Sequence, residues 1–232
     1  MSEHVRPITP RRLARMRGTL ARRQPDLTIV IENVGDPYNV SAMLRSCDAV
    51  GVPTAHLVYS HQELLELSNG VAASAQRWMD LQQHETIADC YSTLRSQSMT
   101  IIATSLREPA RELFDIDLTR PVALVFGNES RGVTDEAIAG ADGTVYIPMM
   151  GMVESLNASV ACSVALYEAL RQRRTAGRYT SPSWTADEID SRLKAWLRRE
   201  DRDPSAADID YDEVRDVPKA LNRYLRDRMP RG

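Results

Sequence analysis

The chain has 232 residues and a formal net charge of -3; its 43% hydrophobic and 26% charged residues are typical of a globular protein and exclude a disordered one. No apolar run approaches the roughly 20 residues of a membrane-spanning helix, and the first residues lack the apolar core of a signal peptide. Three widely spaced cysteines without a Cys-x-x-Cys pair predict a reduced, cytoplasmic protein without structural zinc.

Charge is unevenly distributed along the chain. Residues 1–23 carry a net charge of +6, residues 24–170 carry -12 and residues 171–232 carry +3. Basic extensions around an acidic middle are typical of nucleic-acid binding, although a charged stretch is by default only a solvated face. Only Lys194 and Lys219 are lysines, so the central part holds no lysine for a phosphate-binding loop, a Schiff base or proton abstraction.

Strand and helix patterns alternate from the first helix onward. Strand-like apolar runs occur at 27–32, 54–59, 78–83, 99–105, 122–126 and 144–147. Helical patterns occur at 10–23, 39–50, 61–69, 86–97 and 134–141, and a helix rich in small residues begins near Ala158. This alternation predicts an α/β fold, with a largely parallel sheet covered by helices on both faces.

Three parts are expected along the chain. Residues 1–23 form a basic helical extension, residues 24–179 a central domain, and residues 180–232 a helical extension with helices near 185–199 and 211–228. The aromatic residues of the last part either stack on bases or hold its helices in place. They are Trp184, Trp196, Tyr211 and Tyr224.

Unusual residues follow three of the expected strands. They are Thr104-Ser105, Gly127-Asn128-Glu129, and Pro148 to Met152 with its three methionines. Because ligands of open parallel sheets bind beyond the carboxyl ends of the strands, we expect one pocket with small, polar and thioether walls.

Two kinds of site are not expected. There is no Gly-x-Gly-x-x-Gly motif for a dinucleotide, and no core cluster of histidine, cysteine and carboxylate suggests a metal. The histidines are scattered along the sequence and are expected to be structural or at the surface. They are His4, His56, His61 and His84.

Three motifs carry a resemblance to a known family. They are ENVGDPYNVSAMLRSCDAVGV at 32–52, VFGNESRGV at 125–133 and IPMMGMVESLNASVA at 147–161. With them, the chain resembles the SpoU branch of the SPOUT methyltransferases, and within it the TrmH group of tRNA guanosine-2′-O-methyltransferases. The resemblance implies a homodimer, S-adenosylmethionine as cofactor, and a deep trefoil knot (α/β knot) in the C-terminal part of the catalytic domain, an exception to the rule that chains avoid knots.

The resemblance also implies a reaction. It is methylation of a ribose 2′-hydroxyl in RNA, with guanosine-18 in the D-loop of tRNA as the favoured target, in the cytoplasm and without a membrane or DNA partner. Two alternatives stay open: the same reaction on ribosomal RNA, and an RNA-binding module that has lost catalysis. The family often has Glu-Lys and Pro-His where this chain has Glu129-Ser130 and Pro37-Tyr38, which bears on the target nucleotide more than on the reaction.

Site residues follow from the resemblance by motif position. The implied catalytic residues are Arg45, Asn39, Glu129, Ser155 and Asn157. The implied cofactor contacts, mainly through the main chain, are at Thr104, Gly127, Ile147, Met152 and Leu156, and no metal is implied. Each catalytic residue also has a structural reading, because asparagine and serine can cap or begin a helix, a glutamate can accept main-chain hydrogen bonds, and an arginine can be a surface residue.

Arg45 is the residue whose role is hardest to reconcile with its chemistry. The resemblance implies that it takes the proton from the 2′-hydroxyl, assisted by a substrate phosphate. Because removing a proton from an arginine at neutral pH costs roughly 8 kcal/mol, a second role stays open. In that role Arg45 orients the hydroxyl and the phosphate by bidentate contacts while proton loss follows methyl transfer.

Overall fold

The computed structural model describes residues 8–60 and 77–208, which form two compact units. The larger unit spans residues 24–179, and the described parts of the smaller unit are residues 8–23 and 180–208. The unit boundaries fall at the positions where the sequence analysis divides the chain, but both extensions belong to a single unit. The helices expected at 61–69 and 211–228 lie outside the described residues.

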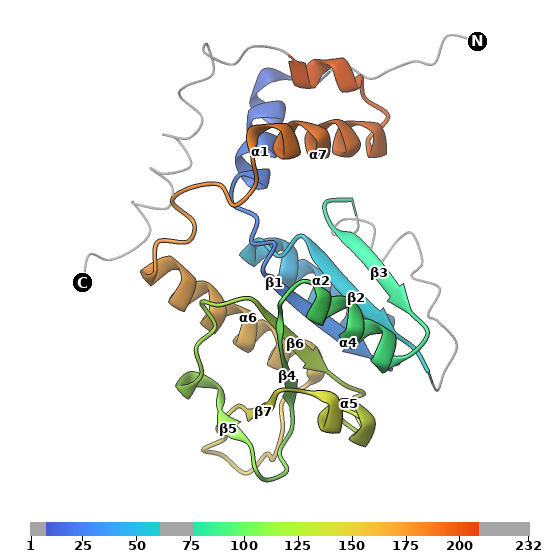
Figure 1. Ribbon diagram of the computed structural model, residues 1–232, viewed down its shortest axis with the longest axis vertical. Coiled ribbons are helices and arrows are strands. Elements are labelled where there is room, and N and C mark those ends of the chain that lie inside the picture. The colour runs from blue at the N-terminus through green and yellow to red at the C-terminus, as the bar shows by residue number, and fades with distance from the viewer. Residues whose placement is uncertain (1–7, 61–76, 209–232) are drawn as a thin grey trace. The chain divides into compact units, whose positions relative to one another are not determined.

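A seven-stranded sheet runs through the larger unit, and its strand pairings are parallel. The strands are β1 (Leu27–Glu32), β2 (Thr54–Val58), β3 (Asp80–His84), β4 (Thr100–Thr104), β5 (Arg111–Glu112), β6 (Val122–Phe126) and β7 (Gly143–Tyr146), in the order β3-β2-β1-β6-β4-β7-β5 (Figure 1). Six of them were predicted to within two residues. The short strand β5, followed by the 3₁₀ helix η1 (Leu113–Asp115), lies between the strands expected at 99–105 and 122–126, where no strand or helix was predicted.

Helices cover both faces of this sheet, as predicted. Alternate side chains of β1 enter different cores, because side chains of a strand point to opposite faces in turn. Leu27, Ile29 and Ile31 pack with α2 (Pro37–Val50) and α6 (Ala158–Thr175), whereas Val30 packs with α4 (Ile87–Ser96) and α5 (Asp135–Gly140). Every residue of β1 and β6 is buried, which explains why both strands are continuous apolar runs rather than alternating ones.

Local signals define the ends of α2, the helix that carries two predicted site residues. Asp36 caps its start and accepts a hydrogen bond from the Tyr38 N–H at 2.9 Å, and Pro37 occupies the first turn. Gly51 ends the helix with a φ of 94°, a left-handed conformation that suits glycine. α2 packs directly against α6, and the Ser46 and Ser163 hydroxyls form a 2.8 Å hydrogen bond between them.

A fully buried arginine anchors the C-terminal half of α6. The Arg173 guanidinium donates to the carbonyls of Leu118 and Arg120 at 2.8 Å each and to the Asp26 carboxylate at 2.6 Å. Further bonds reach the Asp26 carbonyl at 3.1 Å and the Gln24 amide at 3.3 Å. One side chain therefore ties α6 to the segments that lead into β1 and β6.

The smaller unit packs α1 (Pro10–Leu20) against α7 (Ala186–Arg199), followed by the 3₁₀ helix η2 (Pro204–Asp208). Trp184 and Trp196 are buried, and arginine side chains lie over both rings. The structure therefore favours packing over base stacking for these two tryptophans, whereas Tyr211 and Tyr224 lie outside the described residues. None of the helices in residues 8–60 and 77–208 is long and apolar enough to cross a membrane.

Candidate active site

A cavity of about 350 Å³ lies beyond the carboxyl ends of β4, β6 and β7. Residues after each of these strands form its wall, among them Ser105, Asn128 and Met149. The prediction that the three strand ends form one pocket is therefore confirmed. The volume is in the range of sites that bind cofactors and other small molecules.

Most of the predicted site residues meet at this cavity. Those that line it are Thr104, Gly127, Glu129, Ile147, Ser155, Leu156 and Asn157. Asn39, Arg45 and Met152 are not among the lining residues. Met150 and Met152 are 94% and 99% exposed, so the expected thioether wall consists of Met149 alone in this structure. A main-chain contact of Met152 with a cofactor stays a prediction.

The loop after β6 requires a glycine at its first position. A Cβ atom on Gly127 would lie 2.2 Å from the carbonyl carbon and oxygen of Gly132, closer than real contacts allow. The loop closes on itself, because the Asn128 N–H donates to the Gly132 carbonyl at 3.0 Å and the Gly132 N–H returns to the Asn128 carbonyl at 2.8 Å. Glu129 therefore projects from a tightly closed loop.

Glu129 and Asn39 form a pair across 90 residues of sequence. The Asn39 amide donates to a Glu129 carboxylate oxygen at 2.9 Å, and the Gly35 N–H donates to the other at 3.4 Å. Partial burial acts to raise the pKa of Glu129, but these bonds, together with main-chain N–H groups of Glu129 and Asp36, outweigh burial and lower the pKa. The carboxylate is therefore ionised at neutral pH. Asn39 does not cap its helix, since Asp36 does.

The start of α6 lies at the cavity and is capped by Asn157. Its side-chain oxygen accepts hydrogen bonds from the Ser159 N–H at 2.9 Å and the Val160 N–H at 3.4 Å. Ser155, for which helix capping was the structural alternative to a catalytic role, is exposed, lines the cavity and has no hydrogen bond within the described residues. Ala158 and Ala161, also on the wall, allow a ligand to approach the backbone of the helix closely.

Arg45 lies away from Asn39 on α2, as its spacing predicts. It is exposed, whereas Asn39 is buried, and it makes no hydrogen bond or ion pair with any residue that the structure describes. Six residues correspond to about 600° of helix, so the two side chains leave the helix on different sides. Arg45 is thus available to a partner outside this chain.

Sequence reasoning missed residues that hold the loop in place. The Asn128 amide donates to the Asn33 carbonyl at 2.9 Å, and Asn33 adopts a left-handed φ of 51°. The buried Glu32 carboxylate accepts two hydrogen bonds from Thr134, one from its N–H at 2.9 Å and one from the Thr134 hydroxyl at 2.5 Å. A signal was present, because a carboxylate and an asparagine directly after an otherwise apolar buried strand need partners.

Comparisons with known proteins agree with this geometry. A family model described as the SpoU rRNA Methylase family matches residues 26–167. The tRNA (guanosine(18)-2′-O)-methyltransferase of Thermus thermophilus is 44% identical over 195 residues, which are 84% of this chain and 100% of the relative.

Solved structures show the same fold. The A. aeolicus TrmH/SpoU tRNA modifying enzyme has a TM-score of 0.76 and 35% identity, covering 82% of this chain and 96% of its own. An AdoMet-bound rRNA methyltransferase from Sinorhizobium meliloti has a TM-score of 0.57 and 25% identity. The match covers 67% of this chain and 59% of the methyltransferase chain. The predicted α/β fold is confirmed, while the trefoil knot stays a prediction. On motifs, fold and identity together, this chain belongs to the SpoU methylase family.

Proposed function

We propose that this protein transfers a methyl group from S-adenosylmethionine to the ribose 2′-hydroxyl of guanosine-18 in the D-loop of tRNA. One observation carries the proposal: residues of the second and third family motifs meet at a single cavity at the strand ends, in a chain 44% identical over the whole length of a relative with that activity in its name. Ribosomal RNA is the second candidate, because the S. meliloti rRNA methyltransferase shares the fold at 25% identity.

The cavity fits S-adenosylmethionine in size and in the character of its wall. Its volume of about 350 Å³ is adequate for a ligand of that class. The small alanine side chains of α6 leave room beside the helix backbone, and Met149 adds soft apolar surface. The glycine at position 127 allows the loop after β6 to close tightly at the cavity. The residues that would hold the cofactor are Thr104, Gly127, Ile147, Met152 and Leu156. When bound, the cofactor supplies an electrophilic methyl group on a sulfonium.

Glu129 and Asn39 position the site in this proposal. The ionised Glu129 carboxylate fixes the Asn39 amide and the Gly35 N–H, which joins the loop after β6 to the start of α2. Asn157 fixes the start of α6, and Ser155 presents a free hydroxyl to the cavity. These side chains keep the loop after β6, the start of α2 and the start of α6 in one arrangement, which a methyl transfer between two bound molecules requires.

Arg45 acts on the RNA in this proposal. An exposed guanidinium stays charged in water and offers a planar fork of donors, which suits a phosphate oxygen and a neighbouring hydroxyl. We therefore assign Arg45 to orienting the ribose and its phosphate, and treat proton abstraction as the second version of its role. Arg45→Lys keeps the charge but loses the fork, so turnover should fall about 100-fold or more while cofactor binding stays normal.

A homodimer is part of the proposal. α2 and α6 pack together and expose Tyr38 (72%), Val160 (46%) and Tyr167 (53%), apolar surface that a second copy could cover. Sedimentation tests the dimer: the wild type should be dimeric and Tyr167→Glu should shift toward the monomer, because a charge in a buried interface is unfavourable. A monomeric wild type at micromolar concentration would refute the dimer.

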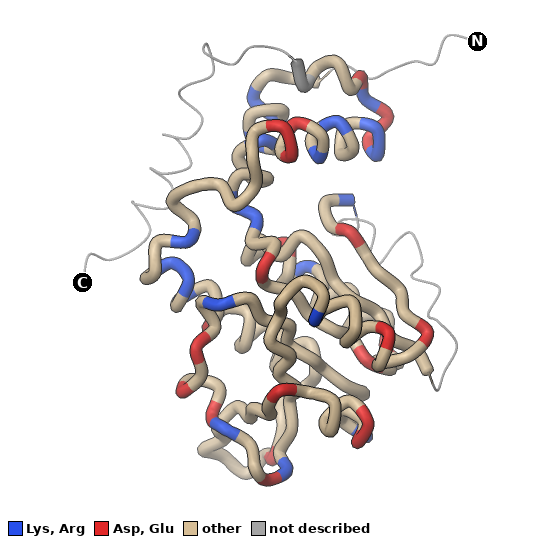
Figure 2. Tube along the Cα trace, viewed as in Figure 1, with Lys and Arg blue, Asp and Glu red and all other residues tan. Residues whose placement is uncertain are grey.

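Exposed arginines of the smaller unit support RNA binding. Arg11 and Arg15 on α1 and Arg198 on α7 are exposed and make no ion pair within the described residues. Figure 2 shows basic positions on both helices, and acidic positions among them on α7. We propose that these arginines contact tRNA phosphates, and that the protein acts in the cytoplasm, where tRNA is modified.

The test is methyl transfer from labelled S-adenosylmethionine to tRNA and ribosomal RNA transcripts, followed by mapping of the methylated ribose. A matched tRNA with 2′-deoxyguanosine at position 18 lacks only the proposed acceptor and should take up no label. Label in ribosomal RNA alone would select the second candidate. A protein that binds the cofactor and both RNAs without transferring label would be a binding module.

A further inference from the structure

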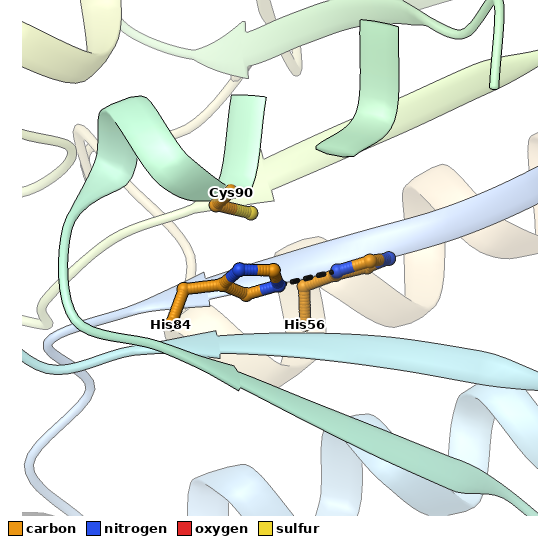
Figure 3. A group of neighbouring side chains, drawn as sticks. All are labelled: His56, His84 and Cys90. Atoms are coloured by element: carbon orange, nitrogen blue, oxygen red, sulfur yellow. Dashed lines mark hydrogen bonds between the residues drawn. The ribbon is translucent and has the colours of Figure 1, made fainter. Parts of the chain in front are cut away.

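Three potential metal ligands meet on one face of the sheet, at the edge opposite the cavity. His56 lies on β2, His84 is the last residue of β3, and Cys90 lies on α4. The His56 Nδ1 and His84 Nε2 atoms are 2.9 Å apart, and the ligand atoms of all three residues lie within 4.8 Å of one another. Figure 3 shows the cysteine sulfur above the paired imidazole rings.

Strand register brings these residues together. β2 and β3 are parallel, and His56 is paired with Gln82, so His84 is its diagonal neighbour and points to the same face. Thr86 caps α4 two residues after His84, and the first turns of the helix then place Cys90 over that face. Separations of 28 and 6 residues hid the cluster from sequence analysis, which treated the histidines as scattered.

Burial keeps the two histidine rings in the neutral form. His56 and Cys90 are 1% and 0% exposed, while His84 is half-buried and leaves an approach from solvent. Burial, with a smaller contribution from His84, lowers the pKa of His56 to about 4, and burial also lowers the pKa of His84. Both rings are therefore neutral at physiological pH, the form in which histidine binds metals.

We propose that His56, His84 and Cys90 form a binding site for one Zn²⁺ ion, with a fourth position open to water. Two imidazole nitrogens and a sulfur are the donors that zinc prefers, and ligand nitrogens around tetrahedral zinc are separated by roughly 3.3 Å. The observed 2.9 Å between the two nitrogens is close to that spacing. Binding requires the two facing nitrogens to separate by a few tenths of an ångström, both rings to turn so that their lone pairs meet at the ion, and the sulfur to approach from within 4.8 Å.

Proton balance sets the pH dependence of binding. The proton shared between the two rings moves to the outer nitrogen of one ring, so that both facing nitrogens offer lone pairs. Cys90 loses its thiol proton to solvent, one proton for each ion bound. Because one proton is released for each ion bound, the affinity for Zn²⁺ should increase as the pH rises.

The ion would stabilise the edge of the sheet. Within residues 8–60 and 77–208, β3 pairs with β2 alone, and its residues are only half-buried or exposed. A metal bound to β2, β3 and α4 at once links this edge strand to the buried part of the sheet. Methyl transfer would not depend on it, because β1 lies between this site and the strands that form the cavity.

The test uses the full-length protein, freed of metal with EDTA and dialysed, and Co²⁺ as a spectroscopic substitute for Zn²⁺. One equivalent of Co²⁺ should produce a thiolate-to-cobalt charge-transfer absorption that Zn²⁺ abolishes. Zn²⁺ at 100 times its Kd should raise the Tm by roughly 5–10 °C, and Mg²⁺ should not.

Variants decide whether these residues are the ligands. Cys90→Ser should lose the charge-transfer band, and Cys47→Ala, which removes another buried free cysteine, should keep it. His84→Gln changes a half-buried ligand, so the fold should persist while Co²⁺ binding weakens at least about tenfold and methyl transfer is unchanged. Absence of the band in the wild type, or full binding by His84→Gln, would show that the pair is only hydrogen-bonded.

Discussion

Arg173→Met should destabilise the larger unit strongly, although the residue touches neither the cavity nor a proposed RNA contact. Its guanidinium is 0% exposed and forms an ion pair with Asp26 together with hydrogen bonds to the Leu118 and Arg120 carbonyls. Methionine fills a similar volume but donates no hydrogen bond. The substitution therefore leaves the buried Leu118 carbonyl, the Arg120 carbonyl and the Asp26 carboxylate with fewer partners.

The magnitude follows from the burial of these groups. Breaking a buried ion pair by removing one partner costs about 3–5 kcal/mol. For a unit of about 150 residues, each 1 kcal/mol lowers the Tm by about 2–4 °C, so the Tm should fall by roughly 6–20 °C. The Tm of Arg173→Lys should lie between those of the wild type and Arg173→Met, because lysine keeps the charge but cannot make the forked set of contacts.

Scanning calorimetry measures the fall in Tm. A control substitution is available on the same helix. Arg171 lies two residues earlier on α6 and pairs with Glu168 at 2.7 Å, but its side chain is 65% exposed. An exposed ion pair is screened by water, so Arg171→Met should change the Tm far less. Equal Tm values for the two methionine variants would refute the view that burial gives Arg173 its importance.

Three further results are expected. Gly127→Ala should weaken S-adenosylmethionine binding about tenfold or more by calorimetric titration, because the new methyl group displaces the Gly132 backbone. Replacing Arg11 and Arg15 by alanine should raise KM for tRNA and leave kcat unchanged. The salt dependence of binding should fall by up to about two counterions. A variant with lysine at both positions keeps the charges, so its KM and salt dependence should stay near those of the wild type. Because burial lowers the pKa of His56 to about 4, the free energy of unfolding of metal-free protein should fall by about 3 kcal/mol from this residue as the pH falls from 6.5 to 4. Urea unfolding should show a smaller loss in His56→Gln, in which the lowered pKa of His84 still contributes.

Much of the fold was readable from local patterns. The β1 and β6 runs identified the strands buried on both faces, and glycine and proline marked the ends of helices such as α2. Such signals survive in a single sequence because strand alternation, helix periodicity and turn chemistry involve residues only a few positions apart. The residues that follow the strands indicated the cavity at the strand ends, and the motif order indicated the family.

Contacts between distant segments were decided by tertiary structure. The pairing of Asn39 with Glu129 depends on how the loop after β6 closes over Gly127, and the outward position of Met152 depends on the path of the chain after β7. The His56 and His84 pair depends on the parallel register of β2 and β3. The sequence by itself determined the elements, their order and the residue types at the strand ends. Only the packing of those elements decided which side chains meet, because strand register and loop closure are set by the whole core and leave no periodic trace in the chain.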